Sequence, residues 1–405
     1  MLRCFGLLCL VTLMSCGRSG EQNSSLSFGS GEHLLLGNQA YEAACQDLPV
    51  CPPILLRADA KESFYYGELV ALSGDFYDER DMLYTERQKP WYQFFGADSA
   101  RTKAIFYREV ASIQAMMDAH SDASYPDLQT RYTLSAPNYV RLSEENYDHF
   151  GFYNSLRYLK EHDAAVELAL EAHALRATDS SKAQRLLQQA LFRNSFADHY
   201  LSDGFASGHI RNPRTQTRAW AEQSGWNERT AGILTKLLHD RDGEIRASGE
   251  HGLPVVNARG DRWFARCDSQ LFYHATPDDF SAKFVIEAIA ISLREVLLAY
   301  AEGTHPSPIP EALNLLPFPA EDTQALSERF NPQTIDSKAL YQSLKWYLKI
   351  PIGRTLSPDV IAAYLGEIPR LMQNFRDDVR LELEANPLFA ERLPEPYRTA
   401  FTHVR

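Results

Sequence analysis

Apolar residues recur every three to four positions along most of this chain, the spacing of helices that bury one face. Between Ser181 and Asp203, alanines and leucines fall on one side of the predicted helix and polar residues on the other. The pattern predicts helices over residues 32–44, 64–73, 100–120, 142–177 (one helix or two), 181–203, 227–239, 283–301, 337–349 and 357–383, and a short C-terminal helix. The sequence therefore predicts an all-α protein.

Two stretches depart from this helical pattern. Residues 245–272 contain turn-forming glycines around short apolar runs, which predicts a β-hairpin or a loop excursion. Residues 305–319 hold five prolines without a helical period, which indicates a linker or a strap that crosses the fold. We expect a main domain over residues 32–303, a proline-rich linker over 304–320 and a helical extension over 321–405.

The first residues have the pattern of an export signal. Arg3 precedes about ten apolar residues, too few to span a bilayer. The sequence Leu13-Met14-Ser15-Cys16 resembles the bacterial lipobox, in which the cysteine is acylated; a plain secretory signal is the alternative. We expect a signal peptide over residues 1–16, a Gly/Ser-rich tether over 17–31, and an exported protein that is an outer-membrane lipoprotein, periplasmic or secreted.

Charge and cysteine content narrow the choice of partners and compartment. The net charge of −12 argues against a nucleic-acid-binding surface, which usually needs a basic patch. It does not exclude an anionic substrate, because bound metal ions reverse the local field. Cys45 and Cys51 enclose five residues, so we predict a small disulfide loop in an oxidising compartment, with free thiols as the alternative. Cys267 is left over.

The clearest chemical motif lies at the end of the 181–203 helix. His199 and Asp203 are four residues apart, so they share one helix face with side chains about 6 Å apart. Gly204 and Gly208 then interrupt the helix, and His209 can fold back toward the same point. Two imidazoles and a carboxylate that converge in this way suit zinc. Buried structural histidines are the alternative explanation.

Further candidate metal ligands stand at the ends of other predicted elements. His33 begins the first helix, Asp75 follows the second, His149 precedes the long helix, and His239 ends a helix in a charged run. Taken singly, each residue has another explanation. These are a polar first-turn residue for His33, a turn or cap residue for Asp75, a half-buried turn residue for His149 and a solvated charge run for the His239 segment. Their order along the chain and their shared chemistry favour a metal site.

In this order the residues resemble the bacterial zinc-dependent phospholipase C family, relatives of the single-strand-specific zinc nucleases. The resemblance rests on His199-Tyr200-x-x-Asp203-x-x-x-x-x-His209, preceded by His33, Asp75 and a His149-Phe150 pair and followed by His239. It covers roughly residues 30–300, and the variant around His209 looks like a Gram-negative branch with a helical C-terminal extension. The resemblance implies an all-α catalytic domain that holds two or three zinc ions.

The resemblance also implies a ligand set for each zinc. One ion would be held by Asp75, His149, His199 and Asp203. A second would be held by His209, His239 and a carboxylate. The family places that acid four residues after the histidine, where this chain has Gly243; Asp240, Asp242 or Glu244 must substitute, and we favour Asp242. A third would use His33 and share Asp203.

The family completes the third site with a mature N-terminal tryptophan. No tryptophan precedes His33 here, so the third metal is expected to be absent, weaker, or completed by another group such as Glu32.

These residues predict zinc-dependent hydrolysis of a phospholipid at a membrane surface, yielding diacylglycerol and a phosphorylated head group. Zinc lowers the pKa of bound water to near 7 and neutralises charge on the phosphate. The resemblance implies that Asp75 orients or deprotonates the attacking water. The alternatives are a zinc-dependent single-strand nuclease and a non-catalytic lipoprotein that binds a lipid or a protein; no nucleic acid and no obligate protein partner are expected.

Overall fold

The computed structural model describes residues 29–46, 48, 50–56, 62–77, 99–119, 131–132, 135–136, 139–243, 252–268, 270–272, 280–320, 335–344 and 356–402. The predicted all-α class with a small β excursion is confirmed. The predicted signal peptide, its Cys16 and most of the tether lie outside these residues. Within the described part of the chain, no helix is long and apolar enough to cross a membrane.

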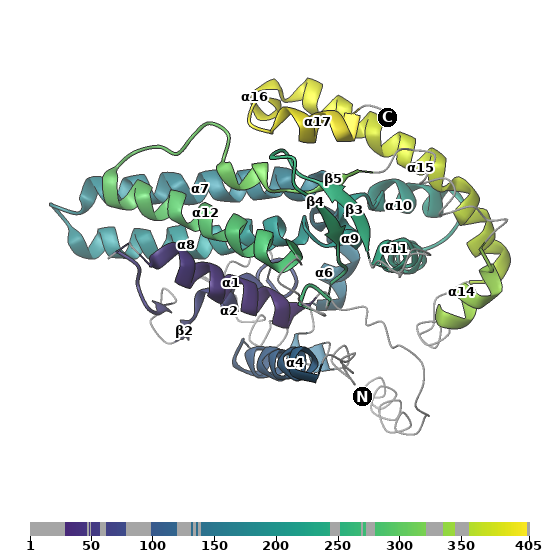
Figure 1. Cartoon of the computed structure of the whole chain (residues 1–405), viewed down its shortest axis with the longest axis horizontal. Coiled ribbons are helices and arrows are strands. Elements are labelled where there is room, and N and C mark those ends of the chain that lie inside the picture. Colours follow the sequence, from purple (N-terminus) through teal and green to yellow (C-terminus); the bar gives the residue numbers. More distant parts are fainter. Residues whose placement is uncertain are drawn as a thin grey trace, which may run out of the picture.

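Four long helices form the centre of the molecule. They are α1 (Ser30–Cys45), α7 (Tyr153–Leu175), α8 (Ser180–Asp203) and α12 (Phe280–Glu302). Figure 1 shows α7 and α8 as an antiparallel hairpin with α12 and α1 packed beside them. The side chain of Asp179 caps α8 by accepting a hydrogen bond from the Lys182 amide, so this helix starts where the sequence indicated.

Shorter elements lie between α1 and α7 in the chain. The strands β1 (Leu55–Leu56) and β2 (Ser63–Phe64) pair antiparallel and lead into α2 (Tyr66–Leu72). Later in the chain come α4 (Ser99–Ala119), α6 (Tyr139–Glu145) and the 3-10 turn η2 (Tyr147–His149). The predicted 142–177 segment is therefore two α-helices, α6 and α7, separated by η2.

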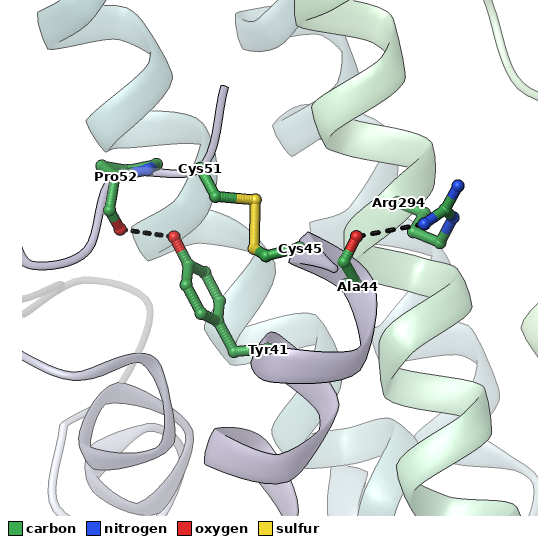
Figure 2. The surroundings of a disulfide bond; sticks show 6 residues. All are labelled: Tyr41, Ala44, Cys45, Cys51, Pro52 and Arg294. Atoms are coloured by element: carbon green, nitrogen blue, oxygen red, sulfur yellow. Dashed lines mark hydrogen bonds between the residues drawn. A yellow bond between two sulfur atoms is a disulfide. The ribbon is translucent and has the colours of Figure 1, made fainter. Parts of the chain in front are cut away.

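The disulfide predicted from the sequence is present. Cys45, at the end of α1, is bonded to Cys51 with a Cα–Cα distance of 5.9 Å. Figure 2 shows it beside the Tyr41 hydroxyl, which donates to the Pro52 carbonyl, and Arg294 of α12, which donates to the Ala44 carbonyl at 3.2 Å. The end of α1 is thus fixed to α12 and to the loop that follows it.

The predicted β excursion is a hairpin to which the proline-rich segment adds a strand. β3 (Leu253–Val256) pairs antiparallel with β4 (Arg262–Ala265) and with β5 (Phe318–Pro319). Before β5, the 3-10 turn η3 (Glu311–Asn314) and the residues after it bury Leu313, Leu315 and Leu316. Of the two interpretations of residues 305–319, linker or strap, these contacts fit the strap.

Six further helices of the described residues lie between Arg214 and Thr402. They are α10 (Arg214–Gln223), α11 (Glu228–Gly243), α14 (Ser337–Leu344), α15 (Pro358–Ala385), α16 (Pro387–Ala390) and α17 (Glu395–Thr402). Figure 1 shows α15 running past α10 and α11 toward α16 and α17, which lie near α7 and β5. The sequence did not predict α10, because its only large apolar side chain is that of Trp220.

Candidate metal centre

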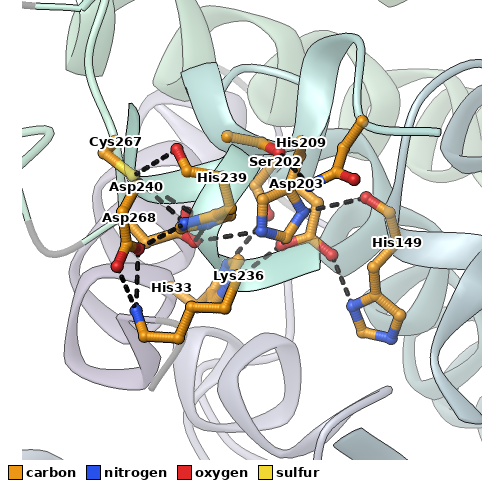
Figure 3. A network of polar contacts seen from close by, with 12 residues as sticks. His33, His149, Ser202, Asp203, His209, Lys236, His239, Asp240, Cys267 and Asp268 are labelled. Atoms are coloured by element: carbon orange, nitrogen blue, oxygen red, sulfur yellow. Dashed lines mark hydrogen bonds and ion pairs between the residues drawn. The ribbon is translucent and has the colours of Figure 1, made fainter. Parts of the chain in front are cut away.

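The predicted site residues come from distant parts of the chain and meet in one place. His33 lies in the first turn of α1, His149 ends η2, and His199 and Asp203 occupy the last turns of α8. His209 lies in the short helix α9 (Ser207–Ile210), which follows α8 directly. Figure 3 shows His33, His149, His209 and His239 gathered around Asp203 and Asp268. Three groups of donors here have the spacing of a metal site.

Asp203 belongs to one of these groups, with His33 and His199, and also contacts His149 of another. Its Oδ2 is 2.7 Å from His149 Nδ1 and 3.5 Å from His199 Nε2, while its Oδ1 is 3.4 Å from His33 Nε2. All of these side chains are buried. The two oxygens of this carboxylate thus face different imidazoles, His33 at Oδ1 and His149 and His199 at Oδ2, an arrangement that would let Asp203 bridge two metal ions.

Asp75, His149 and His199 form the first group, which the backbone at Gly74 brings close together. Gly74 has a φ of +76°, and a Cβ there would lie 2.6 Å from His199 Cδ2 and 2.9 Å from His149 Cε1. Any side chain at this position would therefore displace both rings. Buried Asp75 carries an oxygen, Oδ2, that receives no hydrogen bond from the described residues.

Replacing Gly74 with alanine is expected to weaken zinc binding about tenfold or more, because the added Cβ pushes both imidazoles out of position. The left-handed backbone adds about 1–2 kcal/mol of strain. Gly260→Ala is the matched control, since Gly260 has a φ of +90° and no described atom lies within 4 Å of the place its Cβ would take. Zinc titration of both variants gives the measurement. Equal affinities in the two would show that the ring contacts of Gly74 do not matter.

The second group consists of His209, His239 and Asp268, and here the structure corrects the sequence-based choice of acid. Asp268 Oδ2 is 3.0 Å from His209 Nε2 and 2.8 Å from His239 Nε2. The favoured acid, Asp242, instead makes a buried two-pronged ion pair with Arg211, with N–O distances of 2.8 and 3.0 Å. Asp242 is therefore not part of this group, because its carboxylate is directed at the guanidinium.

The other two proposed acids do not take the place of Asp268 either. Asp240 accepts a hydrogen bond from His239 Nδ1 at 3.1 Å and from Lys236, so it orients the ring from behind. Glu244 lies outside the described residues. A Cβ on Gly243 would lie 2.5 Å from Cys267 Cβ, so the chain that carries Asp268 occupies the space a side chain there would need.

Gly204 and Gly208 of the central motif allow neighbouring segments to pack closely against it. A Cβ on Gly208 would lie 2.2 Å from His239 Cδ2, and one on Gly204 would lie 2.7 Å from Leu316 Cδ2. Gly208 thus lets the His239 ring of α11 approach the chain next to His209. Gly204 lets the strap pack against the end of α8.

Hydrogen bonds behind the imidazoles determine which ring nitrogen faces the centre. His199 Nδ1 donates to the Val70 carbonyl at 3.0 Å, and His209 Nδ1 donates to the His149 carbonyl at 2.9 Å. His33 Nδ1 lies 2.9 Å from the Ser202 hydroxyl, whose own proton is directed at the backbone carbonyls of Asp198 and His199. With Nδ1 engaged in these contacts, Nε2 of each ring is the nitrogen that faces the carboxylates or another imidazole. Such outer hydrogen bonds commonly orient metal-bound histidines.

Burial and neighbouring charges shift the pKa values of the residues in the centre. Burial lowers the pKa values of His199 and His149, which keeps these imidazoles neutral and able to coordinate. Burial and then the charge of Asp203 raise the pKa of Asp75 well above its usual range. Burial opposes protonation of His33, but its hydrogen bond with Asp203 and that carboxylate's charge outweigh this and raise its pKa to about 9, so a metal ion would have to displace the Nε2 proton of His33 in order to bind there. A dication between Asp75 and Asp203 would offset their repulsion.

The roles of Asp268 and Glu32 differ from those that the sequence indicated. Asp268 was missed; its only sequence signal is its place just after the second strand of the predicted hairpin. Ser207 N–H donates to the Arg266 carbonyl at 2.8 Å, which brings this segment against α9. Glu32, suggested as a third-site ligand, accepts a hydrogen bond from the Leu271 amide at 2.8 Å. It therefore fixes the chain beyond Asp268 to α1 and belongs to none of the three donor groups.

Comparisons with known proteins returned no relative. No protein-family model matches the chain, and neither a curated protein nor a solved structure matches it.

Proposed function

We propose that this protein is a zinc-dependent phosphodiester hydrolase of the phospholipase C type. The observation that carries the proposal is the convergence of five histidines and three aspartates in three groups, two of which share His199. Nitrogen donors mixed with carboxylates are the ligands that zinc prefers in proteins. The eight residues of these three groups are His33, Asp75, His149, His199, Asp203, His209, His239 and Asp268.

Bound zinc would activate water and neutralise the charge that develops on a phosphate ester. The chain's own residues would hold the metal ions at fixed spacing and orient the reacting groups. Asp203 would join the His33 side of the centre to the His149 side. Asp75, whose Oδ2 accepts no hydrogen bond within the described part of the chain, could bind metal or take the proton of the attacking water.

Phospholipid is the favoured substrate on grounds of charge and localisation. A net charge of −12 suits a nuclease poorly, since nucleic-acid phosphates are usually bound by a basic surface. The lipobox-like Leu13–Cys16 sequence supports anchoring at a membrane, where phospholipid is abundant.

The purified chain is expected to contain two or three zinc ions and to hydrolyse phosphatidylcholine vesicles. A chelator should lower this activity by roughly 100-fold or more, and zinc, but not magnesium, should restore it. Elemental analysis and a panel of lipid vesicles and single-stranded DNA give the measurement. Faster cleavage of DNA would favour the nuclease. A chain that neither contains nor binds zinc would favour the non-catalytic lipoprotein.

A further inference from the structure

The two sides of the metal centre are joined by a pair of backbone-linked hydrogen bonds. His209 Nδ1 donates to the His149 carbonyl at 2.9 Å, and Gly151 N–H donates to the His209 carbonyl. The Phe150 ring also stacks on the His209 ring, with centroids 4.3 Å apart and an interplanar angle of 18°. Residues 149–151 therefore connect the group that contains His149 with the group that contains His209. We call these three residues the 149–151 turn.

The C-terminal extension packs directly on the 149–151 turn. Gly151 has a φ of +61°, and a Cβ there would lie 2.7 Å from Phe375 Cζ and 2.9 Å from Phe375 Cε2. Phe375 belongs to α15 and is 2% exposed. Its ring thus lies against the backbone that carries the hydrogen bond to His209. The next nearest atom of the described residues is the Asn212 carbonyl oxygen, 3.6 Å from the same point.

The residues that follow the turn are held by the same helices. Phe152 packs against Tyr397 and Phe401 of α17, with centroid distances of 6.1 and 6.0 Å. Tyr153 meets Phe375 edge-on at 6.2 Å. These rings belong to the main hydrophobic core and not to the separate cluster that α14 and part of α15 form with α11. The end of the chain therefore completes the core beside the metal centre.

Polar contacts also fix α15 to α10, the helix that follows α9 and its His209. Gln216 of α10 donates from Nε2 to Asp378 Oδ2 at 2.7 Å, and the hydroxyls of Thr217 and Tyr364 lie 3.1 Å apart. Gln216, Thr217 and Tyr364 are buried. Helix α15 is therefore tied to α10 as well as to the 149–151 turn.

We propose that Phe375 is a positioning residue for the metal centre and that the C-terminal helices act as a brace for it. The inference rests on the proposed function insofar as it takes the centre to bind zinc. The Phe375 ring keeps the 149–151 turn in place, the turn holds His209 through two hydrogen bonds, and His149 and His209 thereby keep their spacing. The extension thus supports the ligands without touching the substrate.

The test is zinc affinity of the full chain, measured by competition with a chromophoric chelator. Phe375→Ala is expected to raise the dissociation constant of the weakest-bound zinc about 10–100-fold, the effect usual for a residue that orients ligands. For phospholipid hydrolysis kcat should fall while KM stays within about twofold, because Phe375 does not bind substrate. Leu381→Ala is the control on the same helix; Leu381 is 58% exposed and should leave affinity and rate unchanged.

Phe375→Leu, which removes less volume, is expected to lie between wild type and Phe375→Ala. It also serves if the alanine variant does not fold. Wild-type zinc affinity in a folded Phe375 variant, even with a lower melting temperature, would overturn the inference, since the ring would then contribute stability alone. A wild-type chain that binds zinc but hydrolyses no phosphodiester would overturn the proposed function and leave the affinity test intact.

Discussion

Replacing Asp203 with asparagine is expected to remove at least one zinc ion from the chain and to lower kcat/KM for phospholipid hydrolysis by roughly 10³-fold or more. Asp203 Oδ1 faces His33, and Asp203 Oδ2 faces His149 and His199. Asparagine keeps the shape but replaces one oxygen by an amide and removes the negative charge, so it cannot serve both sides. Elemental analysis and vesicle hydrolysis measure the two effects.

Asp198→Asn is the matched control for Asp203→Asn. Asp198 is a fully buried aspartate on the same helix, but its Oδ2 accepts hydrogen bonds from Tyr66 at 2.7 Å and Asn194 at 3.0 Å. The control is expected to change thermal stability and to keep the zinc content of the wild type. If Asp203→Asn retained both full zinc content and near-wild-type turnover, the bridging role would have to be abandoned.

The second prediction separates Asp268 from Asp242. Asp268→Ala is expected to remove the zinc held by His209 and His239 and to lower kcat by about 100-fold or more, because it takes away the acid that both rings face. Asp242→Ala should keep that zinc but lower the free energy of unfolding by about 3 kcal/mol, because it removes the carboxylate that a buried arginine contacts twice. Zinc content and thermal unfolding of both variants decide between the residues.

A double variant tests Asp242 without leaving the buried Arg211 unpaired. Arg211→Met with Asp242→Leu replaces the buried ion pair by apolar side chains of similar volume, a change that is often neutral for stability. It is expected to recover most of the stability lost in Asp242→Ala and to bind zinc as the wild type does. Loss of the second zinc from this stable double variant, with retention in Asp268→Ala, would return Asp242 to the ligand set.

Local patterns in the sequence were sufficient for the long helices and for the central motif. The heptad-like spacing of leucines and alanines predicted α8, and the four-residue separation placed His199 and Asp203 on one face of it. The short spacing of Cys45 and Cys51 predicted their disulfide. Each of these features depends on residues close together in the chain, so its geometry follows from helix or loop dimensions alone.

The tertiary structure was needed wherever two distant segments compete for one place. Sequence proximity to His239 favoured Asp242, yet Arg211 pairs with Asp242, and the Ser207–Arg266 hydrogen bond carries Asp268 to the two imidazoles. Helix α10 was missed because its pattern is mostly polar, and its packing partners are α11 and α15.

The sequence by itself thus determined the long helices, the disulfide and the identity of most donors. The fold alone decided which acid faces His209 and His239, and that the C-terminal helices pack against the 149–151 turn. The physical reason is that helix periodicity is a local property, whereas the partner of a buried charge is set by which side chains the packed core brings within a few ångströms of it.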